Sequence, residues 1–371
     1  MPDLILTAKG AVPALEKLLE FDVRYHFGVR DEYSYDFSAV VNADRNPDKW
    51  FLCFHRGQRQ IIKNSEFRKC FRVEDDAIVE FSPSADSKFR RTINAINRDF
   101  DFLDREHYYC YDLQDARQID YADFFGTDLP IPVIQAARRK DYKAIIIPLA
   151  HYHEYPSWNI PKVGDPFRFH EKKPIGFWRG IFAGTVGAGK DSESIANLKS
   201  SQDSDIDILR ITFEKIPRYI LCNEYRGNPK VDAKLVKDNA NATIPTWMRL
   251  LYGERVPISD QCRYKNLISV DGNDGPSNFF WDLRSNSLVL KQDSEWELFG
   301  QCYFRPWVHF VPIAGDIADL EAKLDWCEAH QGECLEIVEN AHAAWDVLFD
   351  PGFQVERRKH GMGTLSAWMA R

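Results

Sequence analysis

The chain has 371 residues, enough for two domains of ordinary size. Its formal net charge is -8, from 48 Lys and Arg against 56 Asp and Glu, which argues against a nucleic-acid-binding protein with its usual basic face. Its apolar runs are too short to span a bilayer, and its first residues lack the basic start and apolar core of a signal peptide. The eight cysteines form no CxxC pair, so we expect reduced cysteines in a cytoplasmic protein without a transmembrane segment.

Before Glu80 the chain shows no clear pattern, but one stretch is rich in basic residues. Six Lys or Arg side chains gather there, namely Arg56, Arg59, Lys63, Arg68, Lys69 and Arg72. A run of charges of this kind usually covers a solvated helix face, and that is the interpretation we favour. The alternative is a contact surface for an anionic acceptor or a membrane.

From Tyr108 onwards, short apolar runs alternate with helical patterns. The runs that predict buried strands cover residues 108–113, 143–149, 176–183, 264–270, 287–291 and 307–312. The segment 192–200 is predicted to open a helix, and the segment 151–173 to form an interdomain loop. Two later helices carry the apolar faces Ile317, Leu320 and Leu324, and Leu335, Val338, His342 and Trp345. This alternation predicts doubly wound parallel sheets, which bind ligands beyond the carboxyl ends of their strands.

The stretch Gly184 to Asp191 reads GTVGAGKD and nearly matches a phosphate-binding P-loop. Gly184, Gly189 and Lys190 are in place, but Asp191 stands where the motif needs Ser or Thr. That hydroxyl binds Mg²⁺ beside the phosphates, and a carboxylate there would add negative charge instead. A kinase is therefore a weak alternative. A glycine-rich turn could still hold a diphosphate through backbone N–H groups.

Two other groups contain residue types that can bind a metal ion. The sequence HYHEY places His151 and His153 on the same side of an extended chain, with Glu154 beside them. A third ligand is not evident, and we interpret these histidines as surface or interdomain residues. Cys327 and Cys334 also lack the spacing of a zinc site, and we expect them to be small apolar residues on two helices.

Residues 271–287, with the sequence DGNDGPSNFFWDLRSNS, connect two of the predicted strands. The first part is dense in Asp, Gly, Asn and Ser, and an amphipathic stretch, FFWDL, follows it. Loops of this composition often bind ligands at the end of a strand. The pattern alone fits an ordinary turn equally well.

The order of motifs in this part of the chain resembles the signature region of glycosyltransferase family 90. The motifs are YKNLISVDGN, SNSLVLK and PWVHFVP, all between Tyr264 and Trp326. Upstream, FWRG at Phe177, PRYILCNEYRGNPKVDAK at Pro217 and YDLQDA at Tyr111 are similar to the family's earlier segments. The resemblance extends over roughly 108–348 and does not cover the first hundred residues.

The resemblance implies a GT-B fold, in which two Rossmann-like α/β domains face a cleft. On this basis we expect an acceptor-side domain at 1–165 and a nucleotide-sugar domain at 166–340. A helical segment at 341–371 is then expected to pack back on the amino-terminal domain. These limits are what the resemblance implies, and the fold class that it implies agrees with the α/β pattern of the sequence.

The resemblance also implies an activity. It is the inverting transfer of a hexosyl or pentosyl group from a UDP-sugar to a hydroxyl of a glycan, glycolipid or glycoprotein, without a cofactor or an essential metal. We expect a role in bacterial lipopolysaccharide or other surface-polysaccharide synthesis, with peripheral contact to the inner face of the membrane as an option. The alternatives are a P-loop-type kinase and a nucleotide-sugar-binding protein without turnover.

Site residues can be carried over by position. Asp115 matches the family's catalytic base, with Asp112 as a poorer match, and one carboxylate suffices to accept the acceptor's proton. Arg218 matches the arginine that faces the donor diphosphate. The other donor-side matches are Arg179, Gly180, Thr185, Asp271, Gly272, Asn273, Ser277 and Asn278. Because many members have Arg where this chain has Asn278, Arg218 and backbone N–H groups would carry more of the diphosphate contact.

Overall fold

The computed structural model describes residues 4–27, 51–63, 65–82, 90, 93–94, 96–112, 133–140, 144–148, 164–186, 193–195, 212–238, 244 and 246–369. The chain divides into two compact units. Unit 1 comprises Met1–Ala11, Asn159–Glu295 and Tyr303–Val347, and unit 2 comprises Val12–Trp158, Trp296–Cys302 and Leu348–Arg371. The domain limits expected from the sequence remain a prediction.

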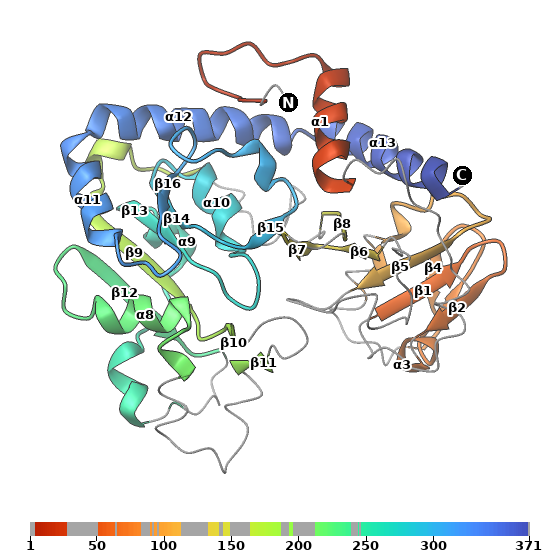
Figure 1. Cartoon of the computed structure of the whole chain (residues 1–371), viewed down its shortest axis with the longest axis horizontal. Coiled ribbons are helices and arrows are strands. Elements are labelled where there is room, and N and C mark those ends of the chain that lie inside the picture. Colours follow the sequence, from red (N-terminus) through yellow and green to blue (C-terminus); the bar gives the residue numbers. More distant parts are fainter. Residues whose placement is uncertain are drawn as a thin grey trace. The chain divides into compact units, whose positions relative to one another are not determined.

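Unit 1 is built on a five-stranded parallel sheet with strand order β12-β9-β13-β14-β16 (Figure 1). Its strands are β9 (Lys173–Ile181), β12 (Val231–Val236), β13 (Tyr264–Ser269), β14 (Leu288–Gln292) and β16 (Val311–Ile313). Its α-helices are α8 (Pro217–Glu224), α9 (Ile258–Gln261), α10 (Asn278–Arg284), α11 (Leu320–Ala329) and α12 (Gln331–Leu348). Smaller elements are the 3₁₀ turns η1 (Phe169–Glu171) and η3 (Thr246–Leu251) and the antiparallel pair β10 (Thr185–Val186) and β11 (Glu193–Ser194).

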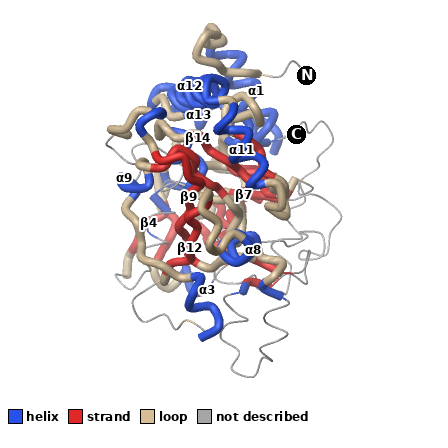
Figure 2. Tube along the Cα trace, turned by 90° about the vertical axis from the view of Figure 1, so that its left-hand side faces the viewer, coloured by secondary structure: helices blue, strands red, loops and turns tan. Residues whose placement is uncertain are grey.

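Helices cover both faces of this sheet. One face carries Trp178 and Leu290, which share a buried cluster with Tyr219 of α8 and Leu324 of α11. Figure 2 shows α8 and α11 on the same side of the strands. Because side chains alternate along a strand, Lys291 points to the other face, where its ammonium group lies 5.4 Å from the ring centre of Phe279 in α10. The sheet is therefore doubly wound.

Unit 2 contains a mixed five-stranded sheet with the order β2-β1-β5-β6-β8. Its strands are β1 (Phe51–His55), β2 (Gln60–Lys63), β5 (Tyr108–Asp112), β6 (Val133–Gln135) and β8 (Ile145–Ile146). Two antiparallel pairs accompany it, β3 (Phe71–Val73) with β4 (Ile78–Glu80) and β7 (Ala137–Arg139) with β15 (Trp296–Leu298). Its helices are α1 (Leu15–Phe27), the single turn α3 (Ser65–Arg68) and α13 (Pro351–Met369), and the 3₁₀ turn η4 (Gln301–Tyr303) follows β15.

The pairing within this mixed sheet changes along its width. β1 is antiparallel to both β2 and β5, whereas β5, β6 and β8 are parallel. Phe54, which is fully buried, stacks on Phe100 and Tyr111 with ring centroids 5.4 and 5.9 Å apart. α1 packs against α13 in the same unit. No helix in the described part of the chain is long and apolar enough to cross a membrane.

Most strand predictions from Tyr108 onwards are confirmed. The runs at 108–113, 176–183, 264–270 and 287–291 correspond to β5, β9, β13 and β14. The run at 143–149 contributes only the two residues of β8, and the run at 307–312 becomes a strand only at Val311. Most of the segment 151–173 lies outside the described residues. Cys327 and Cys334 are buried on α11 and α12, as expected for small apolar residues.

The two closing helices are confirmed at most of their predicted apolar positions. Leu320 and Leu324 are buried on α11, and Val338 and Trp345 on α12, whereas Leu335 is 42% exposed. In the segment 192–200, expected to open a helix, Glu193–Ser194 form β11 and Ile195 is helical, while the other positions lie outside the described residues. Ile317 is buried but precedes α11, in a turn with φ of 65°.

The basic stretch before Glu80 does not form a helix face. Arg56 and Arg59 lie in the turn between β1 and β2, Arg68 ends the single turn α3, and Arg72 lies in β3. Arg56 is buried, and its guanidinium donates to the carbonyl oxygens of Phe100, Leu103 and Asp75. One of the six cations therefore has a structural role.

Candidate functional site

The topology of unit 1 points to one edge of its sheet. Counted along the chain, the strand order is 2-1-3-4-5, so the chain reverses direction across the sheet between β9 and β13. In doubly wound sheets ligands bind in the crevice beyond the carboxyl ends of the strands at such a switch point. Gly184, the first residue of the glycine stretch, follows β9 and the Asp271–Asn273 loop follows β13, so these predicted donor-side residues meet there.

Arg218 connects the two sides of this switch point. It is the second residue of α8, which starts with Pro217 at its first position. Its Nε donates to the carbonyl oxygen of Asp271 at 3.0 Å, and its Nη1 donates to that of Ile181 at 2.9 Å. Its Cζ lies 5.7 Å from the ring centre of Trp178. The guanidinium is thus held between the end of β9 and the loop after β13.

Burial affects the charge of this guanidinium. Desolvation lowers the pKa of Arg218 to about 10, although the nearby carboxylates of Asp271 and Asp274 act in the opposite direction. The side chain therefore keeps its charge at neutral pH. Its Nη2 has no hydrogen-bond partner among the described residues. A cation that has lost part of its hydration and has a free donor is well suited to bind an anion.

Two glycines leave room for this arrangement. A Cβ on Gly272 would lie 2.6 Å from Nη2 and 2.9 Å from Cζ of Arg218. A Cβ on Gly180 would lie 2.4 Å from the indole of Trp178. Both distances are shorter than Cβ contacts in proteins allow, so a larger residue at either position would displace the stacked pair of Trp178 and Arg218. The structure thus gives Gly180 and Gly272 a physical reason to be at this edge.

The loop after β13 is tied to the segment after β9. The side-chain oxygen of Asn273 accepts a hydrogen bond from the backbone N–H of Gly184 at 3.1 Å. The carbonyl of Gly184 in turn accepts from the N–H of Ile195 at 3.0 Å, where β11 pairs with β10. β10 and β11 thus pair on either side of residues 187–192, which lie outside the described residues. The kinase alternative is therefore left to the binding test below.

Asp271 anchors the same loop to the neighbouring strands. Its backbone N–H donates to Oε1 of Gln292 at 2.9 Å, and its Oδ2 accepts from the Ser294 hydroxyl at 2.5 Å. Its Oδ1 is buried without a hydrogen-bond partner among the described residues. Burial raises the pKa of Asp271, while Lys291 and Ser294 lower it. These bonds fix the loop against the end of β14.

Arg179 lies on the opposite face from Arg218. It alternates with Trp178 along β9, and its Cζ lies 4.5 Å from the ring centre of Phe177. Its Nη2 forms an ion pair with Asp232 of β12 at 2.8 Å, and its Nη1 donates to the Asp232 carbonyl at 2.9 Å. The structure therefore does not bring the two arginines together, although they were predicted to serve the same donor.

In the described part of the chain, neither Asn278 nor Ser277 forms a hydrogen bond with the Arg218 guanidinium. The Nδ2 of Asn278 donates to Asp282 Oδ2 at 2.5 Å and to the carbonyl of Ile268 at 3.3 Å, which ties α10 to β13. Ser277 is exposed and precedes α10 without a side-chain cap. Thr185 lies in β10, where only its backbone is described.

Several predicted positions lie outside the described residues. These are Asp115, Gly189, Lys190, Asp191, His151, His153 and Glu154. Asp112, the poorer match for the base, ends β5 and is buried with 3% of its surface exposed. In the described part of the chain, no three or more His, Cys, Asp or Glu side chains are grouped so as to hold a metal ion.

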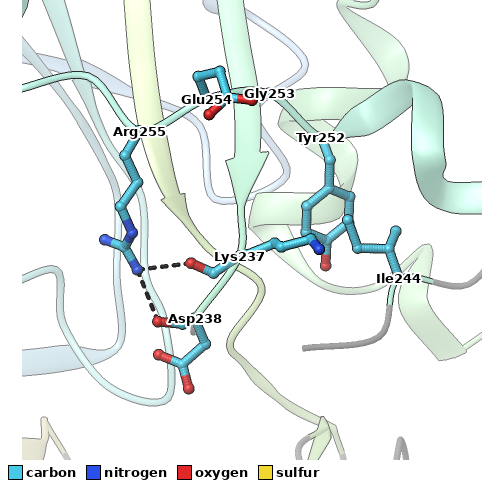
Figure 3. Close-up of a pocket in the computed structure, with 7 residues that line it drawn as sticks. All are labelled: Lys237, Asp238, Ile244, Tyr252, Gly253, Glu254 and Arg255. Carbon is cyan, nitrogen blue, oxygen red and sulfur yellow. Dashed lines mark hydrogen bonds between the residues drawn. The ribbon is translucent and has the colours of Figure 1, made fainter. Parts of the chain in front are cut away.

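A cavity of about 550 Å³ opens at the carboxyl end of β12, on the same edge of the sheet (Figure 3). Lys237 and Asp238 follow the strand, and Tyr252 and Arg255 come from the segment after η3. Arg255 Nη2 donates to the carbonyl oxygens of Lys237 at 2.8 Å and Asp238 at 3.2 Å. Burial raises the pKa of Tyr252 to about 12. We did not identify these residues from the sequence, although a Lys-Asp pair directly after a parallel strand was an available signal.

The sequence of this chain is similar to those of known glycosyltransferases. The model of glycosyl transferase family 90 matches residues 110–345, which is more than half of the chain. Human protein O-glucosyltransferase 1 is 25% identical over 215 residues, covering 56% of this chain and 50% of the human protein. The O-glucosyltransferase rumi homolog of Aedes aegypti is 25% identical over 228 residues, covering 56% and 49%. The chain thus spans about half the length of both relatives.

Two further matches are more distant. Uncharacterized protein 035R of Invertebrate iridescent virus 3 is 25% identical over 141 residues, which cover 38% of this chain and 13% of the viral protein. The solved structure of spinosyn rhamnosyltransferase SpnG is 12% identical, covers 67% of this chain and 59% of its own, and has a TM-score of 0.27, too low to support an inference. The family match and the two O-glucosyltransferases carry the assignment. The chain belongs to glycosyltransferase family 90.

Proposed function

We propose that this protein is a glycosyltransferase that moves a hexosyl or pentosyl group from a UDP-sugar to a hydroxyl group, with inversion and without an essential metal. Family membership and the names of the matched O-glucosyltransferases support sugar transfer. The observation that carries the donor assignment is the Arg218 guanidinium, held between Ile181 and Asp271 at the switch point of a parallel sheet.

In this proposal Arg218 stabilises the departing nucleotide. Negative charge develops on the β-phosphate as the bond to the sugar breaks, and a fixed cation lowers the energy of that state without having to reorganise. The free Nη2 of Arg218 supplies a donor, and Gly272 lets a ligand approach the backbone closely. The N-terminal end of α8, where Arg218 lies, adds a favourable partial charge.

The nucleoside is assigned to the cavity at the end of β12. Neighbouring strands lie about 5 Å apart, so this cavity and the β9–β13 crevice are close enough to hold the two parts of one nucleotide. In doubly wound sheets, an acidic residue at the end of the second strand commonly accepts bonds from ribose hydroxyls. Asp238 follows the strand that is second in chain order, and its side chain is exposed at the cavity.

The acceptor side is assigned to unit 2, which contains Asp115. Asp115 would accept the proton of the attacking hydroxyl, and a single base is enough for inversion. The acceptor itself is left as a hydroxyl-bearing glycan, glycolipid or glycoprotein. The matched relatives described above are animal and viral proteins, so nothing in them supports the predicted role in bacterial lipopolysaccharide synthesis.

The proposal can be tested by thermal unfolding with a panel of nucleotides: UDP-sugars, GDP- and CMP-sugars, and ATP with and without Mg²⁺. A ligand at about 100 times its Kd stabilises the folded state by about 2.7 kcal/mol, which raises Tm by several degrees. We expect a shift with a UDP-sugar that does not need Mg²⁺. A shift only with Mg²⁺-ATP would favour the kinase, and binding without turnover would favour a nucleotide-sugar-binding protein.

A further inference from the structure

Unit 2 contains a pocket of about 520 Å³ where β2, α3, β3 and β5 come together. Three arginines line it, Arg59, Arg68 and Arg72, and none of its lining residues is acidic. Its apolar part includes Phe71, which is 3% exposed, and Phe81, which is 53% exposed. A cavity that combines guanidinium groups with aromatic surface fits an anionic group attached to an apolar or ring-shaped body.

Local structure positions two of these arginines. Arg59 adopts a positive φ of 52° in the turn between β1 and β2, where its N–H bonds the Arg56 carbonyl at 3.0 Å. Its guanidinium forms a fork with Asp75, with Nε–Oδ1 at 2.8 Å and Nη2–Oδ2 at 2.5 Å. Arg72 Nε donates to Glu74 Oε1 at 2.7 Å. The acidic partners hold these arginines in place without lining the pocket themselves.

The third arginine, Arg68, has no partner within the described ranges. Arg68 is exposed and makes neither a hydrogen bond nor an ion pair with any described residue. Arg72 keeps both terminal nitrogens unbonded, and Arg59 keeps Nη1, within the same part of the chain. Arg56 shows the contrast, because backbone carbonyls take up its guanidinium. Among its described lining residues, the pocket therefore presents several unbonded guanidinium nitrogens and no carboxylate.

We propose that this pocket binds a phosphoryl group carried on a sugar or a lipid, with Arg68 as its main contact. A phosphate monoester carries a charge of about -1.5 to -2 and three acceptor oxygens, which match several guanidinium donors. A carboxylate would offer only two oxygens to three arginines. Tyr108 and Phe81 then cover the attached ring or chain. The proposal concerns unit 2 alone and does not depend on the donor assignment in unit 1.

The test uses the full chain and three probes: inorganic phosphate, glucose 6-phosphate, and vesicles containing phosphatidic acid, with phosphatidylcholine vesicles as the reference. We expect at least one phosphate-bearing probe to bind, and Arg68→Ala to raise its Kd about tenfold or more, the effect of losing hydrogen bonds from a charged group. Arg68→Lys should lose less, because it keeps the charge but not the fork. Arg105→Ala is the matched control, an exposed arginine of the same unit that does not line the pocket.

Each outcome decides the proposal. Binding of glucose 6-phosphate or of phosphatidic acid vesicles, lost in Arg68→Ala and kept in Arg105→Ala, supports it and identifies the source of the phosphoryl group. Equal weakening by both substitutions would mean general charge attraction and would overturn it, as would no binding at millimolar probe. Displacement of the probe by UDP would place the probe in unit 1 and also overturn it. A cooperative thermal unfolding transition in Arg68→Ala, followed by circular dichroism, shows that the variant is folded, and Arg68→Gln replaces it if it is not.

Discussion

Arg218 in unit 1 and Arg68 in unit 2 show two ways in which this fold presents a cation. Arg218 is bonded to two backbone carbonyls at the edge of a parallel sheet, and burial lowers its pKa to about 10. Arg68 ends a single helical turn, is exposed, and has no partner in the described part of the chain. Folding therefore holds the Arg218 guanidinium in place, whereas no described residue holds that of Arg68. Salt should therefore weaken binding at the solvated Arg68 more than binding at Arg218.

The largest effect is expected at Asp115. It tests whether unit 2 supplies the base while unit 1 binds the donor. Asp115→Asn should lower kcat by about 10²- to 10⁴-fold, because the attacking hydroxyl loses its base, and should leave the Kd of the UDP-sugar nearly unchanged. Steady-state kinetics and calorimetric titration with the donor measure the two quantities. If Asp112→Asn abolished transfer while Asp115→Asn did not, the base would have been assigned to the wrong carboxylate.

Arg218→Ala tests the fixed cation directly. Removing a charged donor to the diphosphate should raise the Kd for UDP about 10- to 100-fold, and Arg218→Lys should lie in between. Titration calorimetry gives the Kd, and in the unsubstituted protein the affinity should fall as the pH approaches the Arg218 pKa of about 10. Arg263→Ala is the control, since Arg263 lies at the opposite, amino end of β13 in an exposed ion pair with Asp260. Equal affinity in Arg218→Ala and Arg263→Ala would remove Arg218 from the donor site.

Gly272→Ala asks whether the position of the Arg218 guanidinium matters as well as its charge. The new Cβ would meet Nη2 at 2.6 Å and push the guanidinium away from Trp178. We expect the UDP affinity to fall by several-fold to about tenfold, roughly 1 kcal/mol. Gly332→Ala has open space around its Cβ in α12 and should change neither affinity nor stability for the worse. An unchanged Kd in Gly272→Ala would show that the guanidinium can relocate freely.

The smallest effect is expected at Asp282, a carboxyl group that folding buries without a cationic partner among the described residues. Asp282 is 1% exposed, its Oδ2 accepts one bond from Asn278, and its Oδ1 has no partner among the described residues. Burial raises the pKa of Asp282 well above its usual range. The native state then binds more protons than the unfolded chain, so this group's contribution to stability falls as pH rises from the usual Asp pKa through the raised one.

Asp282→Asn should remove that pH dependence. We expect the Tm of the variant relative to the unsubstituted protein to rise with pH, by up to a few degrees, or about 1–3 kcal/mol. Thermal unfolding followed by circular dichroism across the pH range measures it. Asp325→Asn, at an exposed ion pair with Lys230, should show no such trend. A Tm difference that is constant with pH would mean that Asp282 has the same pKa in the native and unfolded states.

Much of unit 1 could be predicted from local sequence. Short apolar runs located β9, β13 and β14, because a buried parallel strand requires a continuous apolar stretch. The motifs shared with the family predicted that Arg218 and the Asp271–Asn273 loop would serve the same site, and the structure brings them into contact. The role of these residues in donor binding remains a prediction that the variants above test.

Other features depended on contacts between distant residues. Arg179 and Trp178 are neighbours in sequence, but alternation sends them to opposite faces of β9, and only the packing of α8 decides which face meets Arg218. The basic stretch became a turn, a strand and a pocket wall because β1 pairs with β5, more than fifty residues later in the chain. The sequence shows which side chains share a face of a strand, but it does not show which element packs against that face.

The sequence by itself determined the family, the parallel strands of unit 1 and the polar loops that follow them. Tertiary structure decided which cation is held at the switch point, which one stays in solvent, and that a cavity forms where Arg255 folds back on Lys237 and Asp238. The physical reason is the separation along the chain between the residues that interact. Strand formation and loop chemistry depend on a few consecutive residues, whereas burial, the pKa shift of Arg218 and the free donors of Arg68 depend on groups that only folding brings together.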